Sequence, residues 1–173
     1  MKNSAAQTTG ATILIVDDQA PTREFLQKTL SDDGFKVIAA ANGADALSVS
    51  DNSQVDLVLL DVMMPGKSGF DVCREIKANP LTYLTPVAFV TALSNKESRI
   101  ESILYGGDDL LTLPVDRIEL LARVRSLLRL KHRTDELERA ESVLITLARI
   151  IEGRDPSAHG HYERISSLSV RLG

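Results

Sequence analysis

Four polar residues stand at the ends of short apolar runs in this sequence. Asp17 and Asp18 follow one such run, and Asp61 follows another. Thr91 closes a third run. The carboxyl ends of parallel strands gather at one edge of an α/β sheet, where ligands bind at the topological switch point. We therefore expect these four side chains to lie close together.

Crowded carboxylates repel one another, and a bound cation relieves the repulsion. Mg²⁺ prefers oxygen ligands, including a few carboxylates together with phosphate oxygens. An aspartate beside such a metal can attack a phosphoryl group and form an aspartyl phosphate, a reaction that depends mainly on positioning and charge neutralisation. The hydroxyl of Thr91 could then donate a hydrogen bond to a phosphoryl oxygen.

A simpler interpretation has to be weighed for each aspartate alone. An aspartate after a strand often only caps the next helix, and Asp17 or Asp18 could cap a helix that begins at Pro21. The combination of acidic residues at separate strand ends favours the phosphoacceptor interpretation.

Apolar runs of strand length alternate with segments of helical period along the chain. The predicted strands are Thr12–Val16, Lys36–Ala40, Leu57–Leu60, Val87–Val90 and Leu110–Leu113. The predicted helices begin at Pro21, with Phe25, Leu26 and Leu30 buried, and at Asn42, and two more span Phe70–Ala78 and Lys96–Tyr105. A long helix begins at Asp116. This order predicts an α/β fold, a doubly wound (βα)5 flavodoxin-like parallel sheet in the order 2-1-3-4-5, with a long C-terminal helical extension.

Composition narrows the classes of protein. The 173 residues carry a net charge of -4 and no run long enough to span a bilayer, so we expect neither nucleic-acid binding nor a membrane span. The chain has a single cysteine, Cys73, so no intramolecular disulfide can form, which fits a cytoplasmic protein. Cys73 is expected to pack in the core.

Several segments together carry a family resemblance: ILIVDDQ, LVLLDVMMPGKSGFDVCREIK, VAFVTA and GGDDLLTLP. Over about residues 11–129 the chain resembles the receiver domains of two-component response regulators. The resemblance implies that a sensor histidine kinase is the partner and Mg²⁺ the cofactor. It also implies a cis peptide bond before Pro114. Carried over residue by residue, it assigns Asp61 as phosphoacceptor, Asp17, Asp18, Asp61 and the Met63 backbone carbonyl as metal ligands, and Thr91 as the switch hydroxyl.

Two positions depart from the family pattern. Leu113 stands where the family usually has a lysine that contacts the phosphoryl group, and Leu110 stands at the aromatic switch position. The metal and the nucleophile remain, so phosphorylation is still expected. Coupling between phosphorylation and conformational change should be weaker.

The helix from Asp116 continues beyond the expected end of a receiver. Leu130, Leu137, Leu144 and Ile151 recur every seven residues. A second series with the same period comprises Leu127, Thr134, Glu141 and Ala148. This pattern predicts a parallel homodimer through a short coiled coil. Packing of the same helix against a downstream domain is the alternative.

The last segment resembles the start of an HD-GYP phosphodiesterase domain, a family that hydrolyses cyclic di-GMP with metal ions. The resemblance rests on RDPSAHGHYERI, in which His161 is a possible outlying ligand and His159 an ordinary surface residue. The residues that name that family are absent from the sequence, so no phosphodiesterase activity is expected of the chain as it stands. The predicted organisation is therefore a tail over 1–11, a receiver over 12–130, a linker helix over 131–154 and a truncated HD-GYP-like start over 155–173.

Three functions remain open from the sequence. The first is a receiver that passes phosphorylation through its C-terminal helix to an output domain. The second is a phosphorylation-independent pseudo-receiver that dimerises, which Leu113 and Leu110 favour. The third is the N-terminal fragment of a cyclic di-GMP phosphodiesterase.

Overall fold

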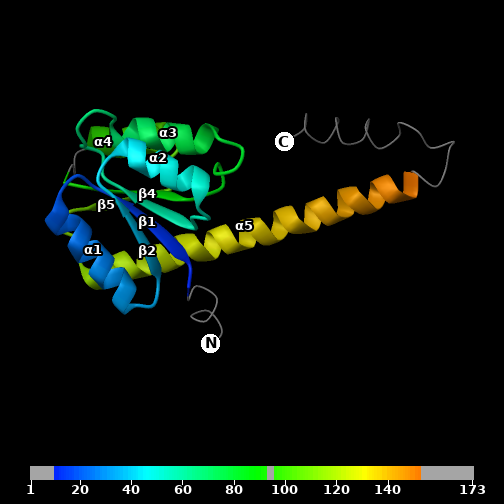
Figure 1. The fold of residues 1–173 in the computed structure, drawn as a ribbon, viewed down its shortest axis with the longest axis horizontal. Helices are drawn as coiled ribbons and strands as arrows, with labels where there is room; N and C mark the ends of the chain where they lie inside the picture. Colours follow the sequence, from blue (N-terminus) through cyan, green and yellow to red (C-terminus); the bar gives the residue numbers. More distant parts are fainter. Residues whose placement is uncertain (1–9, 93–95, 153–173) are drawn as a thin grey trace. The chain divides into compact units, whose positions relative to one another are not determined.

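The computed structural model describes residues 10–92 and 96–152, which form a parallel sheet flanked by helices (Figure 1). The strands are β1 (Thr12–Val16), β2 (Lys36–Ala40), β3 (Leu57–Leu60), β4 (Val87–Thr91) and β5 (Asp109–Thr112). The helices are α1 (Ala20–Asp32), α2 (Gly43–Asn52), α3 (Gly69–Ala78), α4 (Lys96–Leu104) and α5 (Arg117–Glu152). The sheet order is β2-β1-β3-β4-β5 with every pairing parallel, which confirms the predicted fold class.

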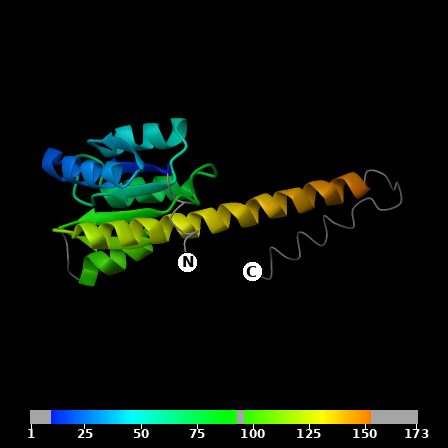
Figure 2. The same cartoon turned by 90° about the horizontal axis from the view of Figure 1, so that it is seen from below.

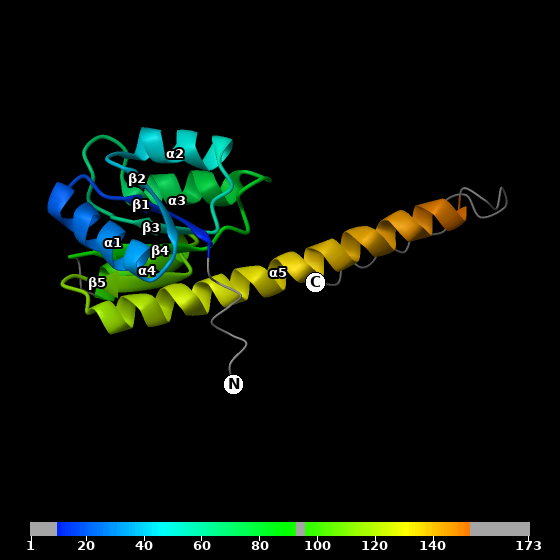
Figure 3. The same cartoon turned by 60° about the horizontal axis from the view of Figure 1, so that its bottom comes forward.

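Each face of the sheet has its own apolar core, because alternate residues of a strand point to opposite faces. Ile13 and Ile15 of β1 pack on one face with α1 and the first part of α5. Leu14 and Val16 pack on the other face with α2 and α3, and Cys73 lies in that cluster as predicted. The views in Figures 1 and 3 show these helices as layers on either side of the sheet. The central strands are buried on both faces, which explains their continuous apolar runs.

Local signals in the sequence set several helix starts. Pro21 lies in the first turn of α1, and the side chain of Asn42 accepts a hydrogen bond of 2.9 Å from the backbone N–H of Asp45. Asp116 accepts a bond of 2.7 Å from the backbone N–H of Ile118 at the start of α5. These contacts satisfy N–H groups that have no partner within the helix.

The prediction that Phe25 of α1 is buried is wrong. Leu26 and Leu30 are buried as expected, but Phe25 is exposed and Thr29 is buried in its place. Residues four apart share one helix face, whereas adjacent residues differ by about 100°. Phe25 and Thr29 therefore lie on a face beside the stripe of Leu26 and Leu30, and of these two only Thr29 is buried.

Helix α5 runs unbroken over its whole length (Figure 2). The chain divides into two compact units between His132 and Arg133, within this helix. Among the described residues, no helix combines the length and the apolar character that crossing a bilayer requires. The predicted HD-GYP-like start with His159 and His161 lies outside the described residues, as does most of the predicted N-terminal tail.

Candidate functional site

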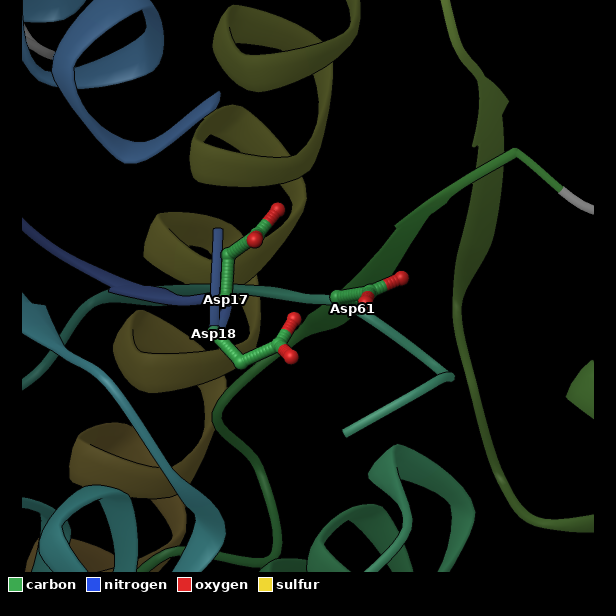
Figure 4. Close-up of side chains that lie close together, drawn as sticks. All are labelled: Asp17, Asp18 and Asp61. Atoms are coloured by element: carbon green, nitrogen blue, oxygen red, sulfur yellow. The ribbon is translucent and has the colours of Figure 1, made fainter. Parts of the chain in front are cut away.

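Three carboxylates meet at the carboxyl edge of the sheet. Val16 of β1 is in register with Leu60 of β3, and the backbone N–H of Asp61 donates a bond of 2.8 Å to the carbonyl of Val16. This pairing places the residues after the two strands side by side. One oxygen from each of Asp17, Asp18 and Asp61 lies within 4.8 Å of the others, and Figure 4 shows the three side chains lying together.

Asp61 is a buried carboxylate surrounded by hydrogen-bond donors. It accepts hydrogen bonds from the backbone N–H groups of Val62 and Met63 and from the hydroxyl of Thr91. Burial raises the pKa of Asp61, the Asp18 charge adds to the rise, and the three hydrogen bonds oppose it. Thr91 therefore lies in contact with Asp61, as the sequence predicted.

Asp17 is also buried, whereas Asp18 is exposed. The Asp17 carboxylate accepts a bond of 2.7 Å from the backbone N–H of Gln19, and its carbonyl accepts one of 2.7 Å from the Arg23 guanidinium. Gln19 itself is the N-cap residue of α1. The simpler interpretation of Asp17 as a helix cap is thus not what the structure shows, because the carboxylate bonds a group ahead of the helix.

The donor set fits a hard divalent cation. The pKa of Asp17 is raised to about 6, chiefly by burial and to a smaller extent by the neighbouring carboxylates of Asp61 and Asp18. The Gln19 backbone N–H and the Arg23 charge only partly offset these effects. The three carboxylates bring together more negative charge than the Arg23 guanidinium offsets, and a Mg²⁺ ion would neutralise the excess.

The raised pKa of Asp17 gives a testable pH dependence. In metal-free protein the folded state holds a proton on Asp17 up to about pH 6, while the unfolded chain releases it near 3.8. Stability from this group is therefore present at low pH and is lost as the pH rises from about 4 to 6. We expect Asp17→Asn to raise the free energy of unfolding in EDTA by about 2 kcal/mol at pH 7 and by much less at pH 4.

Urea unfolding of both proteins at pH 4, 5.5 and 7 in EDTA measures this difference. An Asp17→Asn effect that does not change with pH would contradict the assignment. Excess Mg²⁺ at pH 7 should reverse the sign, because only the wild-type site keeps its full set of carboxylates.

The loop after β3 is held tightly against the phosphoacceptor position. The Ser68 side chain accepts a bond of 3.2 Å from the backbone N–H of Asp71 and so caps α3. Gly69 donates a bond of 3.0 Å to the carbonyl of Val62, and a Cβ at Gly69 would collide with the Asp61 carbonyl. The sequence alone assigns no site role to Gly69 or Arg23, whereas Ser68 is a residue type that favours a helix start beside Asp61.

Other loop residues show the ordinary roles of surface and core side chains. Lys67 pairs with Glu75 at 2.7 Å instead of the acidic site, and the Met63 side chain is exposed. The Met63 N–H bonds Asp61, whereas the role of its carbonyl as a metal ligand stays a prediction.

The two departures from the family pattern both pack against the cores. The Leu113–Pro114 peptide bond is cis, as predicted. Leu113 is partly buried against the core shared by α1 and α5, and Leu110 is partly buried against the core on the other face. Neither side chain offers a polar group to the acidic site.

Comparisons with known proteins agree with the geometry. The family described as "Response regulator receiver domain" matches residues 13–125. The response regulator PleD of Caulobacter vibrioides is 42% identical over 132 residues, which cover 76% of this chain and 29% of PleD. The phosphate regulon transcriptional regulatory protein PhoB of Pseudomonas aeruginosa is 39% identical over 120 residues, covering 69% of this chain and 52% of PhoB.

Two solved structures show the same fold. The BeF3-activated DrrB receiver domain has 34% identity and a TM-score of 0.63, covering 70% of this chain and 99% of that one. The receiver domain of the Francisella response regulator 1452 has 28% identity and a TM-score of 0.65, covering 69% of this chain and 98% of that one. The match of the family model over residues 13–125 and this level of identity show that the chain belongs to the response-regulator receiver family.

Proposed function

We propose that this receiver accepts a phosphoryl group on Asp61 in a reaction that requires Mg²⁺. The observation that carries the proposal is the convergence of three carboxylates within 4.8 Å around a buried Asp61. Its donor would be a phosphohistidine of a sensor histidine kinase, the partner that the family implies. Asp17, Asp18, Asp61 and the Met63 carbonyl would hold the ion.

The residues of the site suit this transfer. An oxygen of the Asp61 carboxylate forms a bond to phosphorus while the bond to the donor nitrogen breaks, and the donor histidine is released. The bound Mg²⁺ would supply positive charge for the phosphoryl oxygens. The hydrogen bonds from Val62 and Met63 keep the carboxylate oriented, and the Thr91 hydroxyl can move from Asp61 to a phosphoryl oxygen.

A phosphate-affinity gel tests the metal requirement. The wild-type protein incubated with a small phosphodonor should show a retarded band with Mg²⁺ and none with EDTA. Absence of the band with several donors in Mg²⁺ would instead favour the pseudo-receiver.

Leu113 allows a second test of the site. We expect Leu113→Lys to bind beryllofluoride with Mg²⁺ roughly 10- to 100-fold more tightly, because a charge-assisted hydrogen bond contributes about 1.5–3 kcal/mol. Leu113→Met is the matched control, since it changes the side chain without adding a charge. Equal affinities of the two variants would mean that residue 113 does not reach the phosphoryl position.

We further propose that the phosphorylated state acts through α5 on an output, and that two copies pair through this helix. The chain spans 29% of PleD and 52% of PhoB, so the output lies beyond what the comparisons cover. Leu137 and Leu144 are 72% and 66% exposed, and both belong to the apolar stripe of α5. An exposed apolar patch usually marks an interaction site. A cytoplasmic location is part of the proposal.

The alternatives keep their own supporting observations. The apolar side chains at Leu113 and Leu110 favour a pseudo-receiver that dimerises without phosphate. The RDPSAHGHYERI segment favours a parent cyclic di-GMP phosphodiesterase, although no catalysis is proposed for this chain. Sequencing the gene beyond the codon for Gly173 decides whether an HD-GYP domain follows.

A further inference from the structure

The coiled-coil stripe of α5 can be completed by either of two neighbouring series of residues, which predict different dimer interfaces. Leu130, Leu137, Leu144 and Ile151 belong to both. The first possible partner series is Leu127, Thr134, Glu141 and Ala148, and the second is Arg133, Ala140 and Leu147. A coiled coil needs an apolar residue at both the a and d positions of each heptad.

The first member of the first series, Leu127, is not available for a dimer interface. Leu127 is 7% exposed and belongs to the receiver core, whereas Leu130 is 57% exposed. Thr134 and Glu141 are the next two members of that series, so Ala148 is its sole apolar residue outside the receiver core. The second series offers Ala140, which is exposed, and Leu147, which is 50% exposed.

Because the two helices are identical, each residue in the core of the seam packs against the same residue of the second copy. In a parallel two-fold dimer each core residue faces its own copy. The first series would place Glu141 against Glu141 of the second copy, and buried like charges strongly oppose each other. In the second series the seam from Leu137 to Leu147 carries no charge, and Glu141 moves to a flanking position in solvent.

The remaining exposed apolar residues point to the same register. With Leu144 at a and Leu147 at d, Val143 and Ile150 flank the seam, and of the exposed large apolar residues described between Leu137 and Ile150 only Ile145 lies outside it. With the first series, Ile145 would flank the seam, but Val143 and Ile150 would both face solvent. The second register therefore buries more of the apolar surface that this helix exposes.

We infer that a second copy of this chain docks in parallel on a seam formed by Leu137, Ala140, Leu144 and Leu147. The inference rests on the proposed homodimer and specifies its register. Glu141 then lies across from Glu136 of the second copy, so added salt should strengthen association by screening this repulsion. Arg133, one heptad before Ala140, would mark the N-terminal end of the seam.

Disulfide trapping tests the register residue by residue. Cys73 is the chain's one cysteine, so Cys73→Ala gives a background free of thiols into which single cysteines can be placed. Ala140→Cys, Glu141→Cys and Ser142→Cys are then oxidised under identical conditions and followed on non-reducing gels. We expect Ala140→Cys to form covalent dimers roughly tenfold faster than either neighbour, because a disulfide needs closely spaced Cβ atoms.

The possible outcomes separate the register from the dimer. Faster trapping at Glu141→Cys, or slow trapping at all three positions in a protein that is dimeric by light scattering, would overturn the seam and leave the dimer standing. A wild-type monomer at high micromolar concentration would overturn both. None of these results bears on phosphorylation of Asp61, which is measured separately.

Discussion

Gly69→Ala should both destabilise the receiver and suppress phosphoryl uptake. A Cβ at this position would lie against the carbonyl of Asp61, with Val62 Cα only 2.9 Å away. These neighbours are backbone atoms, so the loop that carries the phosphoacceptor has to move. We expect the free energy of unfolding to fall by about 3 kcal/mol, at the upper end of overpacking effects. A displacement of about 1 Å at the reacting group can cost roughly 100-fold in rate.

Gly66→Ala provides the matched control in the same loop. Gly66 has a φ of +81°, so alanine there is strained, but its Cβ would meet nothing within 4 Å. This variant should lose about 1–2 kcal/mol and keep its phosphorylation rate near that of the wild type. Urea unfolding and timed phosphorylation of both variants measure the contrast. Equal effects at the two glycines would contradict the close contact between Gly69 and Asp61.

Leu137→Glu combined with Leu144→Glu should convert the dimer to a monomer. Both leucines belong to the stripe under either register, so this prediction does not depend on the seam assignment. Each dimer would have to bury four carboxylates between its helices, and a buried unpaired charge is costly. We expect the dimer Kd to rise at least about 100-fold, which corresponds to about 2.7 kcal/mol. Light scattering across a concentration series measures it.

Ser142→Glu combined with Thr146→Glu is the control for the added charge. Both residues are exposed and lie outside the stripe, and this pair changes the net charge by the same amount. The control should remain dimeric. If both double variants dissociate equally, general repulsion and not the stripe governs association. If neither changes the mass, α5 does not form the dimer interface.

The strands and the acidic site could be predicted because their signals are local. A strand buried on both faces needs a continuous apolar run, and β1, β2 and β3 have the predicted bounds. Parallel pairing then brings the residues after β1 and β3 to one edge, so Asp17 and Asp61 follow from topology alone. Strand β5 begins at Asp109, one residue earlier than predicted. The aspartate is polar, so the apolar run does not show that the strand already begins there.

Other features depend on tertiary packing that periodicity does not show. Leu127 fits a heptad as well as Leu130 does, yet it is buried against the sheet, and Phe25 is exposed beside a buried Leu26. The close approach of Gly69 to Asp61 depends on how the loop after β3 returns to α3. In each case a neighbour distant in the sequence decides the outcome, and local patterns do not contain that information.

The identity of the phosphoacceptor is the central claim, and intact-mass spectrometry tests it directly. Wild-type protein, Asp61→Asn and Asp45→Asn are each incubated with a phosphodonor and Mg²⁺; Asp45 is an exposed carboxylate in the first turn of α2. The wild type and Asp45→Asn should each gain the mass of one phosphoryl group, and Asp61→Asn should gain none. Undiminished uptake by Asp61→Asn, or no uptake by the wild type, would contradict the account.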